Sequence, residues 1–227
     1  MTTVQLRIVQ SGFAVIQDLG RPGYAAIGVS GNGAGDQQSA RLANALVGNA
    51  DDAPLVEITA SGFEATAHGD LLVSVCGAAQ DVEIDGFRWP VAQPLMVASG
   101  SRIRIAQPAV GVRSYLAVNG QLESPRALGS VAPDPLLGFG RRLVVGDNID
   151  VTTAFRAADV FPMPVFRISV PVPRLTSPVT LRATPGPDIH RLAGGADALG
   201  ATFEMLPQSD YIGVRLVGGD LGLAVRD

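Results

Sequence analysis

The chain has 227 residues, of which 17% are charged and 47% are apolar, and it contains 27 glycines and 16 prolines. This length and composition favour a globular, loop-rich protein with one large or two modest β domains, and they exclude a disordered or coiled-coil chain. The net charge of −4 argues against binding to nucleic acid or to an anionic membrane, because both would repel an acidic surface.

All 17 basic residues are arginines, so the chain contains no lysine. A phosphate-binding P-loop, a biotin carrier and a Schiff-base enzyme each need a lysine side chain, and these functions are excluded for this chain alone. Recognition of a phosphate or carboxylate group must therefore come from arginines, from backbone N–H groups or from a partner protein.

The single cysteine, Cys76, excludes an internal disulfide and a cysteine-based zinc site, as is typical of proteins in a reducing compartment. It lies in the apolar run LLVSVCG, which predicts a buried strand residue rather than a nucleophile. The N-terminus lacks the pattern of a signal peptide, and the sequence has no apolar run long enough to span a membrane. We expect a soluble, cytoplasmic protein.

Short strands separated by glycine-containing turns dominate residues 1–160. The first run, VQLRIVQ, alternates between polar and apolar residues, and Asp85-Gly86 between two strand-like halves is a strong hairpin signal. Strands at this spacing predict a mainly β fold, built as an antiparallel barrel or sandwich. Further strands are predicted in FEATAHGDLLVSVCG, PLMVASGSRIRIA, VRSYLAVNG and RRLVVGDNIDVTTA.

Residues 16–36, IQDLGRPGYAAIGVSGNGAGD, form a glycine-rich stretch after the first predicted strand. A dinucleotide-binding fingerprint would need glycine at position 36, where Asp36 stands, and the chain lacks the β-α-β alternation of such folds. Two interpretations remain. Either the glycines allow tight turns that lead into a helix, or the loop binds a ligand with Asp18 and Arg21 pointing inward.

One or two short helices are expected. The first helix begins after Asp36, a good N-cap, and ends at Gly48, and its predicted buried face consists of Ala40, Ala43, Leu46 and Val47. A shorter helix is predicted over residues 187–196.

The prolines divide the chain. We expect a first β domain over residues 1–160 with its helix near 36–47, a proline-rich connector over 161–178, and a partial second β domain over 179–227. Residues 179–188 and 202–219 resemble strands of that second domain.

Several polar residues are candidates for chemistry. Glu57 lies inside an apolar strand, so we expect it to pair with an arginine. Asp134 and Asp188 are loop carboxylates without metal-site spacing, and no metal site is predicted. In PQSDYIGVRL, the turn at Ser209-Asp210 and Arg215 one strand away indicate the wall of a site.

Residues 16–49 resemble the family of the C subunit of 5-oxoprolinase, also called the biotin-dependent carboxyltransferase or allophanate hydrolase subunit 2 family. The family pattern is QD-x-GR-x-G, then P-x-S-G-A-M-D, then R-L-A-N-x-L-V-G-N. The resemblance continues through LVEIT, CGA, SYLAVNG, LGS, PGP and SDYIGVRL. The matching positions in the first block are Gln17, Asp18, Gly20, Arg21, Gly23, Gly28, Gly33, Ala34, Asp36, Arg41–Asn44 and Val47–Asn49.

The resemblance implies cyclophilin-like β-barrel domains and a complex with B-type and A-type subunits that opens 5-oxo-L-proline to L-glutamate at the expense of ATP. ATP would be shared with the partner, and no biotin would be attached to this chain. Asp18 and Arg21 are the expected catalytic residues. We expect Arg21 and Arg215 to bind the substrate carboxylate or phosphate, and Asp18 to orient Arg21. The expected substrate-binding residues are Asp36, Ser209, Asp210 and Arg215.

The sequence also departs from the family pattern. The run at residues 30–36 lacks the usual Pro, Ser and Met, so we expect a looser loop, and Tyr211 and Ile212 replace the Arg and Met of the usual S-D-R-M-G motif. The family pattern continues beyond the residues that end at Asp227, so the second barrel is expected to be incomplete. Two alternatives follow: a carboxyltransferase domain of a biotin-dependent urea or amide carboxylase, or a non-catalytic regulatory subunit of the B-type partner.

Overall fold

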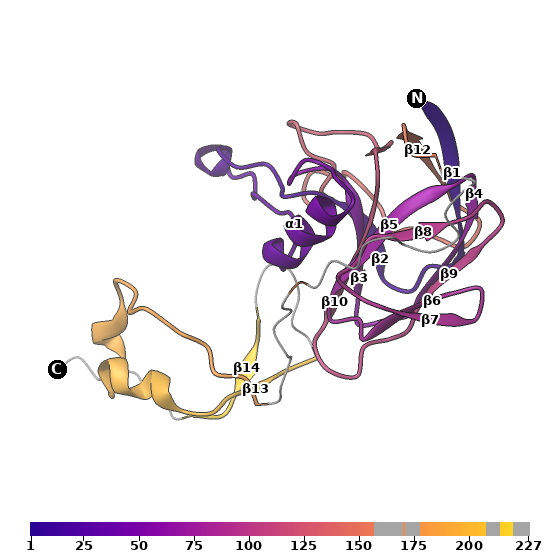
Figure 1. Cartoon of the computed structure of the whole chain (residues 1–227). Coiled ribbons are helices and arrows are strands. Elements are labelled where there is room, and N and C mark those ends of the chain that lie inside the picture. The colour runs from indigo at the N-terminus through magenta and orange to yellow at the C-terminus, as the bar shows by residue number, and fades with distance from the viewer. Residues whose placement is uncertain (157–169, 171–177, 208–213, 220–227) are drawn as a thin grey trace. The chain divides into compact units, whose positions relative to one another are not determined.

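The computed structural model describes residues 1–156, 170, 178–207 and 214–219. The chain divides into two compact units, Met1–Thr176 and Ser177–Asp227, and each is considered by itself (Figure 1). The predicted mainly β class is confirmed. The proposed connector over residues 161–178 lies almost entirely outside the described residues and stays a prediction.

Two antiparallel sheets build the first unit, and each ends in edge strands within the described residues. The larger sheet has the strand order β11 (Gln121–Leu122), β12 (Asn148–Thr153), β1 (Thr2–Gln10), β4 (Phe63–His68), β9 (Arg102–Ile105), β6 (Asp81–Ile84) and β7 (Phe87–Pro90). The smaller sheet has the order β2 (Ala14–Gln17), β3 (Leu55–Thr59), β10 (Arg113–Val118), β5 (Leu71–Gly77) and β8 (Leu95–Val97).

The core lies between the two sheets. Alternate residues of the larger sheet, such as Leu6 and Ile103, meet Val56, Val75 and Leu116 of the smaller sheet in one buried cluster. Because successive side chains of a strand point to opposite faces, the residues between them point away from this core. In the smaller sheet these residues form the opposite face, which is also buried and includes Leu55, Cys76 and Tyr115.

Helix α1 (Gln37–Leu46) covers that second face (Figure 1). Ala40 and Ala43 are buried against Leu55 and Ala117, as the predicted helical face requires. At the start of the helix, the Asp36 carboxylate accepts a hydrogen bond of 3.0 Å from the Ser39 N–H, which confirms the predicted N-cap. The helix thus stacks as a third layer on the smaller sheet.

The turns also follow the sequence. Asp85 and Gly86 between β6 and β7 have φ angles of 50° and 84°, as a two-residue hairpin turn with a left-handed backbone requires. Gly48 after the helix has φ 76°, and its N–H donates to the Ala45 carbonyl, which closes the last turn.

The second unit is more sparsely structured. The predicted helix over residues 187–196 is replaced by two 3₁₀ segments, η2 (Ile189–Arg191) and η3 (Gly195–Gly200), because Gly194 and Gly195 disfavour a continuous helix. The strand predicted over 179–188 is absent from these described residues, which contain Pro185 and Pro187. One two-stranded ladder joins β13 (Glu204–Met205) to β14 (Leu216–Val217).

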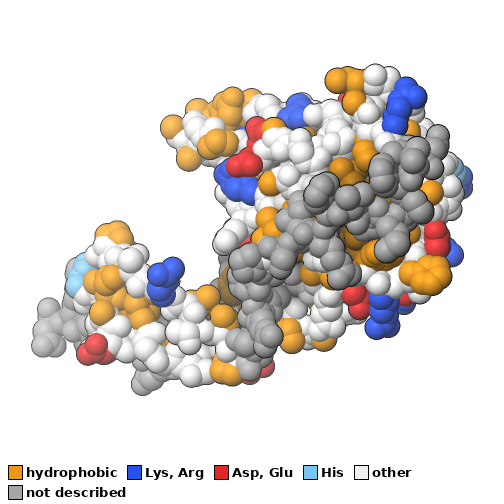
Figure 2. Space-filling model, in the orientation of Figure 1, with side chains coloured by type: hydrophobic (Ala, Val, Ile, Leu, Met, Phe, Trp, Pro, Cys, Tyr) orange, Lys and Arg blue, Asp and Glu red, His pale blue; other side chains and the backbone are white. Residues whose placement is uncertain are grey.

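No described residue of the second unit is buried. Figure 2 shows hydrophobic side chains on the surface of this unit. Leu181, Met205 and Leu216 are among its exposed hydrophobic residues. In the described part of the whole chain, no helix is both long and apolar enough to cross a membrane.

Cys76 lies on the helix-covered face of β5 and is 2% exposed, as the apolar run around it predicts. Burial raises the pKa of its thiol to about 12, a hydrogen bond involving the Ala92 backbone opposes this shift, and the Asp36 charge adds to it. Because the thiolate is the reactive form of cysteine, this thiol is inert in the folded protein.

We expect a disulfide reagent to leave Cys76 unmodified in the folded protein and to modify it after unfolding in urea. The raised pKa also predicts stability that is fully present below pH 9.0 and is lost as the pH rises toward about 12. The absorbance of the released thiol measures the labelling rate, and equal rates before and after unfolding would contradict this placement.

Candidate functional site

The glycine-rich loop folds back on itself after β2. The Arg21 N–H donates to the Gly31 carbonyl at 2.6 Å, and the Ala34 N–H donates to the Asp18 carbonyl at 2.8 Å. Gly33 has φ 97°, and a Cβ atom there would lie 2.5 Å from the Leu19 carbonyl carbon. The glycines therefore allow two backbone segments to lie in direct contact, as the structural interpretation of the loop predicts.

Asp18 is almost completely buried, with 5% of its surface exposed. Its carboxylate accepts hydrogen bonds from the Gly20 N–H at 2.8 Å, the Ser130 hydroxyl at 2.5 Å and the Val131 N–H at 2.8 Å. The Arg126 guanidinium lies 3.9 Å from the same carboxylate. These donors compensate the buried negative charge and tie the loop to residues 126–131.

Arg21 is the largest fully buried side chain described, and its guanidinium is directed at protein acceptors. Nη1 donates to Asp134 Oδ2 at 3.3 Å, Nε donates to the Ala127 carbonyl at 3.3 Å, and Nη2 donates to the Ala132 carbonyl. The ion-pair partner of the Arg21 guanidinium is therefore Asp134. In this arrangement its donors hold the segment that follows residue 126.

Asp134 uses both of its oxygens. Oδ2 accepts from Arg21 and, at 2.9 Å, from the Asn32 side-chain amide, while Oδ1 accepts from the N–H groups of Leu136 and Leu137. Asn32, which departs from the family pattern, also donates to the Pro133 carbonyl. Asn32 therefore attaches the run at residues 30–36, which we expected to be looser, to Pro133 and Asp134.

A second polar cluster holds the start of α1. Glu57 is fully buried and accepts from the Gly35 N–H at 3.0 Å and from Arg113 Nε at 3.3 Å, which confirms the expected pairing with an arginine. The Asp36 N–H donates to the Tyr115 hydroxyl at 2.7 Å. Burial, reinforced by the nearby Glu57 charge, raises the pKa of Tyr115 well above its ordinary value. A Cβ atom on Gly35 would lie 2.5 Å from Arg113 Nε, so glycine leaves the space that Arg113 fills.

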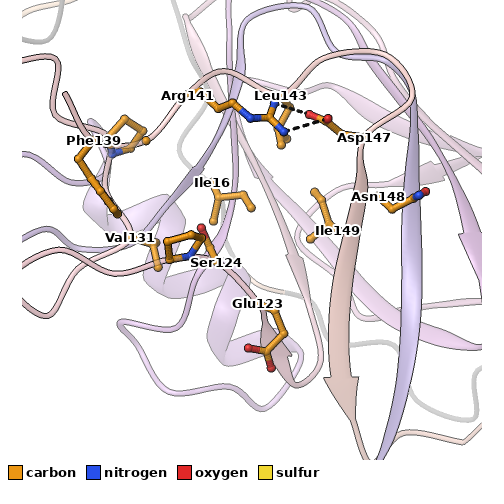
Figure 3. Close-up of a pocket in the computed structure, with 13 residues that line it drawn as sticks. Ile16, Glu123, Ser124, Val131, Phe139, Arg141, Leu143, Asp147, Asn148 and Ile149 are labelled. Carbon is orange, nitrogen blue, oxygen red and sulfur yellow. Dashed lines mark hydrogen bonds and ion pairs between the residues drawn. The ribbon is translucent and has the colours of Figure 1, made fainter.

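A pocket of about 250 Å³ lies beside the segment that Asp18 and Arg21 hold (Figure 3). Ile16, Val131, Leu143 and Ile149 form its apolar part. The remaining lining residues are Glu123, Ser124, Pro125, Pro133, Phe139, Gly140, Arg141, Asp147 and Asn148. Since Val131 and Pro133 belong to the segment braced by the glycine-rich loop, that loop sets the shape of one wall.

The other predicted site residues are placed elsewhere. Asp36 caps α1 and is exposed, and Arg215 lies on the surface of the second unit, where its carbonyl accepts from the Leu206 N–H at 2.8 Å. Ser209 and Asp210 lie outside the described residues. The structure therefore brings together Asp18 and Arg21, and the roles predicted for all six residues stay predictions. In the described ranges, no group of three His, Cys, Asp or Glu side chains is placed to hold a metal ion.

Sequence reasoning missed the importance of Asp134, Ser130 and Asn32. Each acts through a contact with a residue more than 100 positions away, and the sequence carries no local signal for such a contact. The one available signal was the sequence Pro-Asp-Pro-Leu-Leu-Gly, in which an aspartate between prolines predicts a side-chain-capped turn.

Residues 27–226 match the carboxyltransferase domain, subdomain A and B. The chain belongs to this carboxyltransferase domain family. Among individual proteins, it is 31% identical to the C subunit of 5-oxoprolinase from Escherichia coli K12 over 220 residues, which is 94% of this chain and 68% of that protein. It is 29% identical to the urea amidolyase of Saccharomyces cerevisiae, across 89% of this chain and 12% of that protein.

Two solved structures have a similar fold. The crystal structure of TTHA0988 aligns with a TM-score of 0.82 at 31% identity, covering 97% of this chain and 44% of that chain. The Kluyveromyces lactis urea carboxylase aligns with a TM-score of 0.79 at 26% identity, covering 97% of this chain and 21% of that chain. The carboxyltransferase domain thus corresponds to a part of several longer proteins.

The contact between Gly33 and Leu19 in this carboxyltransferase domain is testable. Gly33→Ala should destabilise the protein by about 1–3 kcal/mol, because it adds a side chain at a positive φ and against the backbone. Gly31→Ala is the matched control, since a Cβ atom there meets nothing within 4 Å. Urea unfolding of both variants measures the difference, and equal losses would show that the close approach is unimportant.

Removal of the Arg21 guanidinium should leave the Asp134 charge buried and uncompensated. We expect Arg21→Ala to cost about 3–5 kcal/mol of unfolding free energy. Arg41→Ala, which breaks the exposed pair with Asp51, should cost less than about 1 kcal/mol. If the double variant Arg21→Ala/Asp134→Ala lost the full sum of the two single losses, the two side chains would not be coupled.

Proposed function

We propose that this chain is a subunit of an ATP-dependent 5-oxoprolinase-type complex, which opens 5-oxo-L-proline to L-glutamate together with B-type and A-type subunits. The observation that carries this proposal is the 31% identity to the C subunit of E. coli 5-oxoprolinase across 94% of this chain. The corresponding 5-oxoprolinase protein of Haemophilus influenzae is 32% identical over 140 residues. The predicted cytoplasmic location is part of the same proposal.

The glycine-rich loop does not fit a phosphate cradle. Its N–H groups at Gly20, Arg21 and Ala34 donate to acceptors within the loop itself, so they are already used. We therefore propose that ATP is bound mainly by a partner subunit. Covalently attached biotin is not expected on a chain without lysine.

In this proposal, Asp18 and Arg21 act on the substrate through the segment that they hold. Both side chains are buried, and their bonds fix residues 126–134 next to the pocket. A wall fixed in this way keeps polar groups at constant positions, which favours binding and catalysis over a wall that must first become ordered.

A carboxyltransferase acting on urea or a related amide is the second candidate. It is supported by the 26–29% identity to urea amidolyases and urea carboxylase. Because residues 1–227 contain no lysine, carboxybiotin would be carried outside these residues. A non-catalytic subunit that regulates the B-type partner is the third candidate, and it is supported by the replacement at Tyr211 and Ile212 of the arginine-containing family motif.

Reconstitution distinguishes these candidates. The chain is co-purified with B-type and A-type subunits, and release of glutamate from 5-oxoproline is measured with and without ATP. We expect ATP-dependent release that disappears when this chain is omitted. Urea with a carboxylated biotin carrier serves as the competing substrate.

Transfer of the carboxyl group to urea without glutamate release would favour the carboxyltransferase. A complex of the B-type and A-type subunits that releases glutamate equally well without this chain would favour the regulatory role.

A further inference from the structure

Arg141 is the one cationic side chain among the residues that line the pocket. Its Nη1 and Nη2 donate to the two carboxylate oxygens of Asp147 at 2.7 and 3.0 Å, and Nη1 also donates to the Arg142 carbonyl at 3.0 Å. A guanidinium carries five N–H donors in a planar fork. Among the described residues, nothing accepts from the other two, Nε–H and the outer N–H of Nη2. One edge of the Arg141 guanidinium is therefore open to a ligand.

Asp147 holds the opposite edge of that guanidinium in place. The Ile8 N–H donates to the Asp147 carbonyl at 2.8 Å, and the Asp147 carboxylate accepts from the Val144 N–H at 2.8 Å. The hydrogen bonds and charge of Arg141 lower the pKa of Asp147, so the pair stays charged at neutral pH. The Arg141 side chain is 65% exposed, which leaves it accessible to a small molecule. A donor pair fixed in this way loses little freedom on binding, which favours a two-point contact with a carboxylate.

The remainder of the pocket suits a small ring. Its apolar part is formed by four aliphatic side chains, and the Phe139 ring adds an aromatic surface. Arg21 Cζ lies over this ring, 5.9 Å from its centroid, which links the pocket to the buried ion pair with Asp134. The volume of about 250 Å³ is below the range of about 300–1,000 Å³ that is usual for drug-sized ligands. The pocket therefore favours a small molecule with an apolar part.

Glu123 limits the charge that the pocket accepts. Figure 3 shows Ile16 between the Arg141–Asp147 pair on one side and Glu123 on the other. Glu123 accepts from the Thr152 hydroxyl at 3.2 Å and adds a negative charge that Arg141 does not pair with. Because like charges repel, a doubly charged phosphate is disfavoured, while a single carboxylate on Arg141 is compensated. The carboxylate of Glu123 can also accept from an N–H group of the ligand.

We propose that Arg141 binds the carboxylate of 5-oxo-L-proline through Nε–H and Nη2–H, while the lactam ring packs on Phe139 and the aliphatic side chains of the pocket. We call Arg141, Asp147 and the pocket the carboxylate site. The structure favours the class of small cyclic monocarboxylates, and the choice of 5-oxo-L-proline within this class rests on the proposed function.

The test is the affinity of the full chain for 5-oxo-L-proline, measured by titration calorimetry. Arg141→Gln should weaken binding by about 10-fold or more, because it removes a charge-assisted, two-point contact. Arg142→Gln is the matched control. Arg142 is the next residue along the chain, but its guanidinium lies 4.7 Å from the centroid of the Phe13 ring, and Arg142 does not line the pocket. Its variant should bind 5-oxo-L-proline as tightly as the wild type does.

Three further measurements separate carboxylate binding from a general effect on the pocket. γ-Butyrolactam, which has the same ring without the carboxylate, should bind the wild type about 10-fold more weakly than 5-oxo-L-proline does. Arg141→Gln should bind it as the wild type does, which shows that the pocket of the variant is intact. Arg141→Lys keeps the charge but loses the planar fork, so it should recover only part of the affinity for 5-oxo-L-proline. Inorganic phosphate should compete only weakly, since Glu123 repels a second negative charge.

Equal affinities of the wild type and Arg141→Gln for 5-oxo-L-proline would overturn the proposal, as would a wild-type chain that does not bind this molecule. Phosphate that binds more tightly than 5-oxo-L-proline would also overturn it. Binding that depends on Arg141, in a complex that never releases glutamate, would support the carboxylate site and contradict the proposed function. Glutamate release with a KM for 5-oxo-L-proline that Arg141→Gln leaves unchanged would overturn the carboxylate site and leave the proposed function intact.

Discussion

The buried ion pair between Arg21 and Asp134 joins two loops that are 113 residues apart in the sequence. A buried pair contributes to a defined structure only when further hydrogen bonds satisfy both charges. Here backbone carbonyls complete the acceptors around Arg21, and Asn32 with two backbone N–H groups completes the donors around Asp134. The glycine-rich loop, the pocket wall and the turn at residues 134–139 therefore depend on one another.

Much of the first unit could be predicted because the relevant signals are local. The cap at Asp36, the hairpin turn at Asp85-Gly86 and the apolar face of α1 each involve residues within a few positions, so propensity and periodicity are sufficient. The partners of Asp18, Arg21 and Glu57 could not be read in this way. A buried charge predicts that some partner exists, but only the sheet register and the loop packing decide which residue it is.

In the second unit, an alternating sequence pattern is not sufficient to form buried strands. Its apolar residues alternate as strands would, yet none of the described ones is buried, and the prolines and glycines at 185–195 limit the regular elements to short segments. Alternation stabilises a strand only where another layer covers its apolar face. The strand that alternation predicted over residues 179–188 is absent, and no layer covers the apolar side chains among the described residues of this unit.

The contact between Gly35 and Arg113 links two positions that no element of secondary structure joins. Methionine, the family residue at position 35, would overlap the Arg113 guanidinium, so Arg113 would have to shift from the position in which it donates to the buried Glu57. A side chain at position 35 therefore requires a different arrangement of Arg113 around Glu57. Substitutions at positions 35 and 113 should therefore occur together during evolution. A change in the glycine-rich loop would then be accompanied by a change in strand β10, which contains Arg113.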